Sequence, residues 1–202
     1  MSRGKLRNLM GVKSVREIDF DDWVPIEESV LCFVRKRLDR QVLLIYKKTG
    51  LGAGLINAPG GRIERGETPE EAAVREAREE VSIDVEKLSF SGNLYFQFTN
   101  GHSIRGYVFQ TETWFGKPLE TAEATPFWCG ENSIPYDKMW VDDELWLPQL
   151  LADRYFSGRF VFDDQTAISM SLEVEASMEN HIQADYAKYR IIPDIKGRNL
   201  DA

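Results

Sequence analysis

The positions of apolar residues along the chain predict mainly short β-strands. Runs rich in Val, Ile, Leu and aromatic residues alternate with turn residues, a pattern typical of strands. The first two runs, residues 29–35 and 42–46, flank a turn at residues 38–40 and predict a hairpin. The later runs are residues 85–98, 104–114, 126–129, 156–162 and 167–174. The turn signal at residues 99–101 separates two of these runs, which are therefore expected to pair antiparallel.

A helix is expected over residues 69–81. Thr68 is a candidate N-cap, and Pro69 suits the first helical position. Glu70 and Glu71 place negative charge at the end of the helix where the dipole favours it. No residue from there to position 81 breaks a helix, so this is the best-defined helix of the sequence.

The order of elements predicts a mixed sheet sandwiched between helices. A second helix with an acidic start is expected over residues 142–151, although Pro148 makes the position of its first turn ambiguous. Strands occur on both sides of the first helix, and the second helix follows later in the chain. The predicted fold class is therefore α/β (α+β), with α/β/α layers.

One folded domain is expected, with an extension at each end. The 202 residues, 43% of them hydrophobic, are enough for a single sizeable core, which we place in residues 26–176. Residues 1–25 are expected to form a flexible or loosely docked arm, with a partner-binding arm as the alternative. Residues 177–202 are interpreted as a polar tail with a candidate helix over residues 178–189.

The charge of the chain limits its partners. A net charge of −8 argues against nonspecific binding to nucleic acid polymers, but it is compatible with a small polyanion delivered with its metal ion. The sequence shows no signal peptide and no apolar run long enough to span a bilayer, so a cytoplasmic location without a membrane partner is expected. Protein partners are left open.

The first helix carries an unusual group of acidic residues. Glu76, Glu79 and Glu80 are spaced i, i+3 and i+4, so their carboxylates share one face and repel one another. A bound cation would offset that repulsion, and three hard oxygen ligands suit Mg²⁺ or Mn²⁺, which commonly accompany phosphate chains. The alternative is a solvated acidic face on which Arg75 and Arg78 form local ion pairs.

The loop before this helix favours the metal interpretation. Gly60 and Gly61 permit a tight backbone that could offer a carbonyl, assigned to Gly60, to the same cation. In chain order, the loop and helix contain Gly61, Glu67, Arg75, Glu76, Ala77, Glu79 and Glu80. This order and spacing resembles the Nudix box. Ser82 stands where the family has glycine, which would strain the turn after the helix if that turn needs a positive φ.

The resemblance implies a Nudix fold and hydrolysis of a nucleoside diphosphate linked to another group. In this interpretation Glu76, Glu79 and Glu80 hold the metal ion, which lowers the pKa of the attacking water. Either Glu79 or Glu80 is the general base. Arg75 is expected to orient these carboxylates, and Glu67 is expected to anchor the loop to the helix.

Other segments are similar to the animal MutT-homologue hydrolases of oxidised purine nucleoside triphosphates. The similar segments are residues 47–48, 52–54, 57, 139–148 and 156–160, and the resemblance extends over about residues 30–174. It implies that Asn57, Asp142 and Asp143 contact the purine and that Trp140 stacks on it. The alternatives are that Trp140 is a core residue and that Asp142 only caps a helix.

The same resemblance gives roles to residues around the purine. Neighbouring carboxylates in a partly dry pocket repel, so one of Asp142 and Asp143 is expected to keep its proton and donate while the other accepts. Leu51 stands where the family has a larger aromatic residue, which would relax or redirect purine selectivity. Lys47 would reach either the pocket or the phosphates. Glu123 is a candidate additional metal ligand or proton acceptor, with a simple surface charge as the alternative.

The sequence thus predicts an Mg²⁺-dependent Nudix pyrophosphohydrolase, with Mn²⁺ as a possible substitute. Its expected substrate is a purine nucleoside triphosphate such as 8-oxo-dGTP, converted to the monophosphate and pyrophosphate in nucleotide-pool sanitation. One alternative keeps this chemistry with another substrate, such as ADP-ribose or a dinucleotide polyphosphate. Another is a nucleotide-sensing Nudix module without catalysis, against which the intact Glu76, Glu79 and Glu80 argue.

Overall fold

The computed structural model describes residues 9–175 and 190–195. Its helices are η1 (Val15–Glu17), α1 (Pro69–Val81), η2 (Tyr136–Lys138) and α2 (Asp143–Leu151). Its strands are β1 (Glu27–Lys36), β2 (Gln41–Lys47), β3 (Ile56–Asn57), β4 (Gly60–Arg62), β5 (Asp84–Glu86), β6 (Ser89–Phe98), β7 (Ser103–Thr111), β8 (Thr113–Phe115), β9 (Ala124–Gly130), β10 (Phe156–Asp163), β11 (Thr166–Val174) and β12 (Arg190–Ile195).

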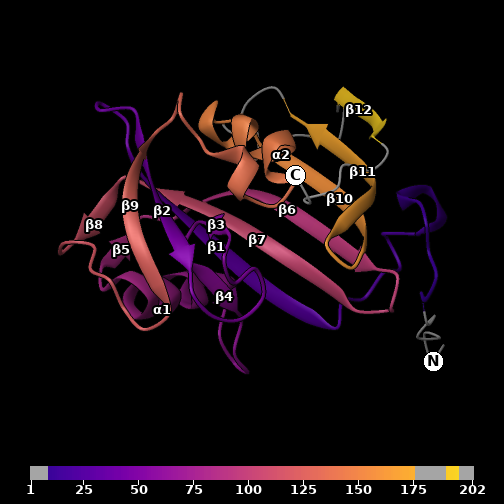
Figure 1. Cartoon of the computed structure of the whole chain (residues 1–202), viewed down its shortest axis with the longest axis horizontal. Helices are drawn as coiled ribbons and strands as arrows, with labels where there is room; N and C mark the ends of the chain where they lie inside the picture. Colours follow the sequence, from indigo (N-terminus) through magenta and orange to yellow (C-terminus); the bar gives the residue numbers. More distant parts are fainter. Residues whose placement is uncertain (1–8, 176–189, 196–202) are drawn as a thin grey trace.

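Most of the strands form one mixed sheet (Figure 1). Its order is β12-β11-β10-β6-β7-β1-β2-β3, with β4 paired to β1 and β9 paired to β2. The pairs β1–β7 and β6–β10 are parallel, and the other pairs of this sheet are antiparallel. The predicted hairpin of β1 and β2 and the predicted antiparallel pair of β6 and β7 are therefore confirmed. Strands β5 and β8 form a separate two-stranded sheet.

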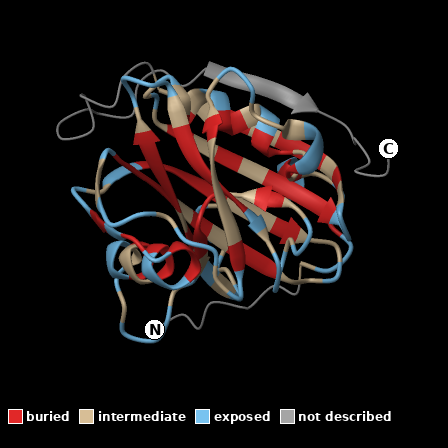
Figure 2. Ribbon diagram, turned by 60° about the vertical axis from the view of Figure 1, so that its left-hand side comes forward, coloured by how far each residue is buried: buried red, intermediate tan, exposed pale blue. Residues whose placement is uncertain are grey.

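The two faces of the sheet carry different helices, which confirms the predicted α/β/α class. Successive residues of a strand point to opposite faces. In β1, Phe33 packs against Trp146 of α2, with ring centroids 5.8 Å apart. Its neighbour Cys32 belongs to the buried cluster that contains Ala73 and Ala77 of α1. Figure 1 shows α1 and α2 on opposite sides of the central strands, and Figure 2 shows that the strands between them are largely buried.

Helix α1 forms where its caps predict it. Thr68 Oγ1 accepts a hydrogen bond from Glu71 N, and Glu71 Oε2 accepts one from Thr68 N, which completes a capping box. The buried apolar residues of the helix are small, Ala72, Ala73, Ala77 and Val81, so the helix lies close to the sheet. At its C-terminus Ser82 adopts φ 59° and ψ 34°, the left-handed conformation for which the family uses glycine.

Four features of the strands and of α2 differ from the sequence predictions. The long run predicted over 85–98 divides into β5 and β6 around Lys87, which has φ 51°. The run predicted over 104–114 divides likewise into β7 and β8, and the short strands β3 and β4 were not predicted. Helix α2 begins at Asp143, and Pro148 lies inside it rather than in its first turn.

The arm is packed on the domain in its described part. Val12, Val15 and Ile18 are each at most 8% exposed and form a cluster with Val161 of β10. The expectation of a flexible or loosely docked arm is therefore wrong for residues 9–25, because these apolar side chains are buried against the sheet.

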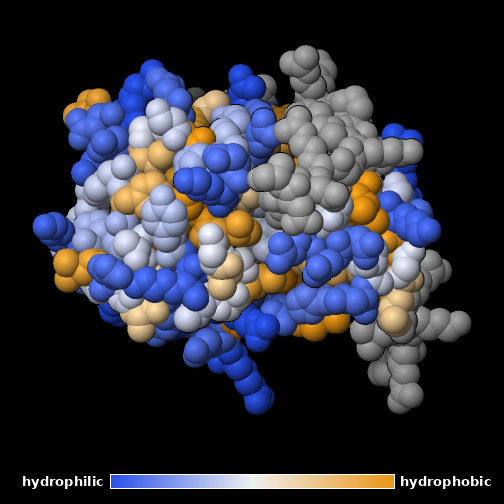
Figure 3. Space-filling view, viewed as in Figure 1, coloured by the Kyte–Doolittle hydropathy of each residue, from blue (hydrophilic) through white to orange (hydrophobic). Residues whose placement is uncertain are grey.

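Beyond β11 and Glu175, residues 190–195 are described and form strand β12. The candidate helix over residues 178–189 lies outside the described residues, and the strand β12 that follows was not predicted. Within the described ranges, each helix is too short or too polar to cross a bilayer. Figure 3 shows hydrophilic side chains over much of one face, with smaller groups of apolar side chains between them.

Candidate active site

Helix α1 distributes its three predicted metal ligands unequally. Glu80 is 1% exposed and Glu76 is 8% exposed, so both carboxylates face the interior of a groove. The side chain of Glu79 is 54% exposed. Burial raises the pKa of Glu76, and the neighbouring Arg75 opposes that rise.

Arg75 organises the acidic residues of the box. Its Nε donates to Glu67 Oε1 over 2.7 Å, and its Nη1 donates to both Glu76 Oε1 (2.8 Å) and Glu79 Oε2 (2.9 Å). Glu67 also accepts from Glu64 N, which fixes the loop, and the hydrogen bond from Arg75 holds the pKa of Glu67 below its usual range. The positions of Arg75 and Glu67 thus agree with an orienting and an anchoring role.

Glu80 is held by a second cation. Its Oε1 lies 2.8 Å from Lys47 Nζ, and its Oε2 accepts a hydrogen bond from Gly60 N over 2.9 Å. Lys47 Nζ also lies 3.3 Å from the Gly60 carbonyl oxygen. Lys47 therefore lies in the groove beside the box glutamates and does not line the apolar cavity next to it.

Gly61 permits the close approach of strand β4 and helix α1. A Cβ at this position would lie 2.2 Å from Glu76 Oε1, closer than atoms can approach. Any side chain here would displace the Glu76 carboxylate, which is a physical reason for glycine at this box position.

The oxygen atoms of this groove fit a divalent cation in type. Glu76, Glu80, Glu123 and the backbone of Gly60 line a groove of about 590 Å³, and carboxylate and carbonyl oxygens are the ligands that Mg²⁺ prefers. The ammonium of Lys47 already bridges the Gly60 carbonyl and Glu80, which shows that these atoms attract a cation. Within the described part of the chain, no three acidic, histidine or cysteine side chains converge on one point. Instead, Glu76 accepts a hydrogen bond from Arg75 and Glu80 accepts one from Lys47.

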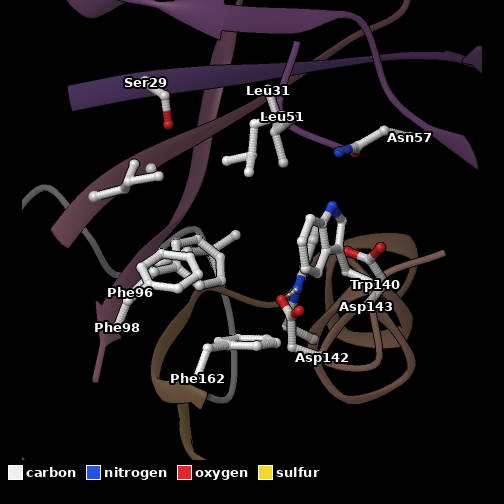
Figure 4. Close-up of a pocket in the computed structure, with 14 residues that line it drawn as sticks. Ser29, Leu31, Leu51, Asn57, Phe96, Phe98, Trp140, Asp142, Asp143 and Phe162 are labelled. Carbon is white, nitrogen blue, oxygen red and sulfur yellow. Dashed lines mark hydrogen bonds between the residues drawn. The ribbon is translucent and has the colours of Figure 1, made fainter. Parts of the chain in front are cut away.

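A second, largely apolar cavity of about 120 Å³ adjoins this groove (Figure 4). The two spaces share four lining residues, Ser29, Leu31, Leu51 and Asn57. The cavity is also lined by Leu94, Phe96, Phe98, Ile104, Gly106, Trp140, Asp142, Asp143, Trp146 and Phe162. A ligand with a flat apolar end and a polyanionic end can therefore extend from the cavity into the groove.

Trp140 forms one wall of the cavity. It is half-buried, and its ring meets Phe162 edge-to-face with centroids 5.7 Å apart. The loop before β3 lies against it, because a Cβ at Gly52 would be 2.9 Å from Trp140 Nε1. On the other side of the cavity, Asn57 Oδ1 accepts from Ala58 N, and Figure 4 shows its amide nitrogen turned toward the cavity. The arrangement leaves the Trp140 ring beside a space for a flat ligand.

Asp142 and Asp143 are buried polar residues in this apolar cavity. They are 2% and 3% exposed, and Asp142 Oδ1 and Asp143 Oδ2 have no hydrogen-bond partner among the described residues. Asp142 Oδ2 accepts from Trp146 Nε1 over 3.0 Å. Asp142 occupies the N-cap position of α2, but its side chain makes no capping hydrogen bond. Unpaired buried oxygens of this kind indicate a polar ligand.

The surroundings raise the pKa of both aspartates, but to different extents. Burial raises the pKa of Asp142 to about 6, although the hydrogen bond from Trp146 opposes the rise. Burial and then the charge of Asp142 raise the pKa of Asp143 well above its usual range. Of the two, Asp143 therefore holds its proton more strongly and is the better donor, and Asp142 is the better acceptor.

Several cavity residues were missed by the sequence reasoning. Phe96 and Phe98 of β6 alternate with Gln97 and point to one face, and Phe162 of β10 joins them there. That alternation is visible in the sequence, but it does not say which face of the strand borders a cavity. Ser29 was missed as well, because it lies at the edge of an ordinary strand.

Known proteins are similar to this chain in sequence and in fold. The family model of the NUDIX domain matches residues 25–150. The "Oxidized purine nucleoside triphosphate hydrolase" of Danio rerio is 39% identical over 129 residues, covering 63% of this chain and 83% of that protein. The Mus musculus protein of the same name is 38% identical over 135 residues, with coverages of 66% and 86%. A crystal structure of a mutator MutT protein from Bacillus halodurans has a TM-score of 0.65 at 26% identity, covering 73% of this chain and 97% of that chain. With the Nudix box, the sheet between two helices and these relatives in agreement, the chain belongs to the NUDIX domain family.

Proposed function

We propose that this protein hydrolyses purine nucleoside triphosphates, oxidised ones such as 8-oxo-dGTP in particular, to the monophosphate and pyrophosphate, and so cleans the cytoplasmic nucleotide pool. The observation that carries the proposal is a pair of buried carboxyl groups, each with one oxygen that has no hydrogen-bond partner among the described residues, in an aromatic cavity that adjoins the groove of the Nudix box. The printed names of the relatives from Danio rerio and Mus musculus support it.

Nudix hydrolases generally use divalent metal ions, and we assign Mg²⁺, with Mn²⁺ as a substitute, to the groove. Glu76, Glu79 and Glu80 would hold the ion together with the Gly60 carbonyl, and Glu123 would add a further ligand or accept a proton. When bound, the ion neutralises phosphate charge and lowers the pKa of the attacking water.

The residues of the chain then have distinct tasks. Arg75 holds Glu67, Glu76 and Glu79 in place through its hydrogen bonds. Lys47 provides positive charge on the phosphate side of the groove. Glu79 or Glu80 accepts the proton of the attacking water, a positioned carboxylate being a suitable general base.

The cavity recognises the base by stacking and by hydrogen bonds. Trp140 stacks on the purine. Asp143, the carboxyl of the pair that holds its proton more strongly, donates to a purine oxygen or ring nitrogen, while Asp142 accepts from a ring N–H or an amino group. Asn57 adds an amide donor from the opposite side, and Leu51 leaves the cavity mouth wider than an aromatic residue would.

The test is pyrophosphate release with Mg²⁺ from 8-oxo-dGTP, 2-oxo-dATP, dGTP, dATP, ADP-ribose and a diadenosine polyphosphate, compared as kcat/KM. We expect an oxidised purine triphosphate to be preferred. In the double variant Glu79→Gln, Glu80→Gln, kcat should fall at least about a thousandfold while the fold stays intact, because the two carboxylates that are removed stabilise the transition state. Glu70→Gln, on the exposed first turn of the same helix, is the matched control and should remain active.

Each other outcome has a defined meaning. Preference for ADP-ribose or the dinucleotide would retain Nudix chemistry and remove the purine triphosphate assignment. Absence of turnover with every compound would favour a nucleotide-sensing module. Normal turnover by the double glutamate variant would contradict the metal assignment.

A further inference from the structure

The arm before β1 lies against the face of the sheet opposite the purine cavity. Its residues Phe20 and Trp23 pack on Tyr95 of β6, with ring centroids 5.7 and 5.6 Å from that of Tyr95. Figure 1 shows this part of the arm, in indigo, beside the end of the β6–β7 hairpin. The arm is therefore in contact with the strands that form one cavity wall.

Gln97 connects the arm to that hairpin. Its side chain is 1% exposed, and its Oε1 accepts a hydrogen bond from Trp23 Nε1 over 2.9 Å. Its Nε2 donates to the carbonyl oxygens of Phe98 and His102, each over 3.1 Å. One buried amide thus joins the arm to both ends of the turn between β6 and β7, and its acceptor oxygen depends on Trp23.

Two backbone contacts reinforce this connection. Gly11 N donates to Thr99 O over 2.8 Å, and Ile26 N donates to Ser103 O over 3.1 Å. The arm is therefore hydrogen-bonded to the hairpin on each side of its turn. Side-chain and backbone contacts together join the hairpin to the arm.

The β6–β7 hairpin also contributes residues to the lining of the purine cavity. Phe98 at the end of β6 and Ile104 near the start of β7 line the cavity. His102, between them, lines the adjoining groove. Gln97 lies between Phe96 and Phe98 on the same strand. A shift of the Gln97 side-chain amide would therefore move the backbone that orients both phenyl rings.

Resting on the proposed function, we propose that Trp23 is a positioning residue for the substrate: through Gln97 it holds the β6–β7 hairpin so that Phe98 and Ile104 fit the purine. Trp23 touches neither the cavity nor the groove, so its effect falls on substrate binding and not on the hydrolytic step. The arm is then a functional part of the base-recognition wall.

The kinetic test compares Trp23→Phe with Phe20→Leu in the full chain, using 8-oxo-dGTP and Mg²⁺. Trp23→Phe keeps an aromatic ring beside Tyr95 and removes the N–H that bonds Gln97. Phe20→Leu alters the same aromatic cluster without touching that hydrogen bond. We expect KM to rise about fivefold in Trp23→Phe with kcat within about twofold of wild type, and Phe20→Leu to stay near wild type in both.

A second test asks whether Trp23 acts through Gln97. In the Gln97→Leu background, Trp23→Phe should change KM no further, because the hydrogen bond is already absent. Hydrogen exchange without nucleotide gives a readout independent of turnover. The amides of residues 98–103 should exchange faster in Trp23→Phe than in Phe20→Leu.

The outcomes separate this inference from the function on which it rests. If wild type turns over 8-oxo-dGTP and both variants have its KM, the positioning role is overturned alone. Additive effects of Trp23→Phe and Gln97→Leu on KM would overturn the route through Gln97. If wild type turns over no substrate, the proposed function fails, and the kinetic role of Trp23 fails with it.

Discussion

Asp142 and Asp143 show at the scale of single residues how burial creates a recognition pair from two ordinary carboxylates. Each is nearly inaccessible, and each keeps one oxygen without a hydrogen-bond partner among the residues that the structure describes. Desolvation favours the neutral form of both carboxyl groups. Once one of them ionises, its negative charge further disfavours ionisation of the other. The hydrogen bond from Trp146 favours the ionised form of Asp142, so the proton stays on Asp143.

This division predicts a pH dependence for purine recognition. As pH rises through the elevated pKa of Asp143, the pair loses its donor and becomes doubly negative, so kcat/KM for the preferred purine triphosphate should fall. Asp143→Asn keeps an N–H donor that does not titrate, and it should remove that fall while retaining activity. The measurement is kcat/KM between about pH 6 and pH 9 for both proteins.

The control for this experiment is Asp142→Asn, which replaces the acceptor and should lower kcat/KM at every pH. An unchanged alkaline fall in Asp143→Asn would show that another group titrates. That result would assign the fall to the hydrolytic side of the site and remove the donor role from Asp143.

At the scale of secondary-structure elements, α1 connects sequence to function most directly. Its capping box, its row of small buried residues and its Arg75 network all lie within a short stretch of chain. Local signals of this kind can be read from sequence, which is why the helix and the positions of its carboxylates were predictable. The division of β5 from β6 was not, because apolar residues continue on both sides of Lys87 and the break depends on the pairing of β5 with β8.

The C-terminus of α1 gives a prediction about stability. Ser82 sits at φ 59°, where a Cβ costs roughly 1 kcal/mol relative to glycine. Ser82→Gly should therefore raise the free energy of unfolding by about 0.5 kcal/mol, the greater freedom of glycine in the unfolded chain offsetting part of the gain. Urea unfolding measures this change, and kcat should stay within about twofold of wild type because Ser82 touches no site residue.

Lys87→Gly is the matched control for Ser82→Gly. Lys87 has φ 51° in a connection outside the box, so the substitution relieves the same kind of strain at another place. A loss of stability in Ser82→Gly together with a gain in Lys87→Gly would show that the Ser82 side chain contributes a stabilising interaction. The family glycine would then not be an improvement in this chain.

At the scale of the whole molecule, the site consists of parts with different predictability. In the box groove, the buried glutamates and the glycine backbone come from α1 and β4, which are neighbours in the chain, and β1 and Lys47 of β2 add to the lining. The purine cavity combines β1, β6, β7, β10 and α2. Asn57, Trp140 and the aspartate pair could be named from resemblance, whereas Phe96, Phe98 and Phe162 became cavity residues only once the parallel pairing of β6 with β10 placed them together. The packing of the arm depends in the same way on a sheet face that does not exist until distant strands meet.

The net charge of −8 predicts how salt affects the capture of substrate, because the field of the whole protein acts on a charged substrate as it approaches the site. A nucleoside triphosphate stays negative when it carries Mg²⁺, so the protein as a whole repels it, and salt screens that repulsion. With Mg²⁺ held saturating, kcat/KM should stay level or rise by up to about twofold between about 20 and 200 mM KCl. A protein that binds polyanions through a basic surface would show a steep fall instead. Such a fall here would mean that Lys47 and its basic neighbours, rather than the net charge, dominate the field at the groove.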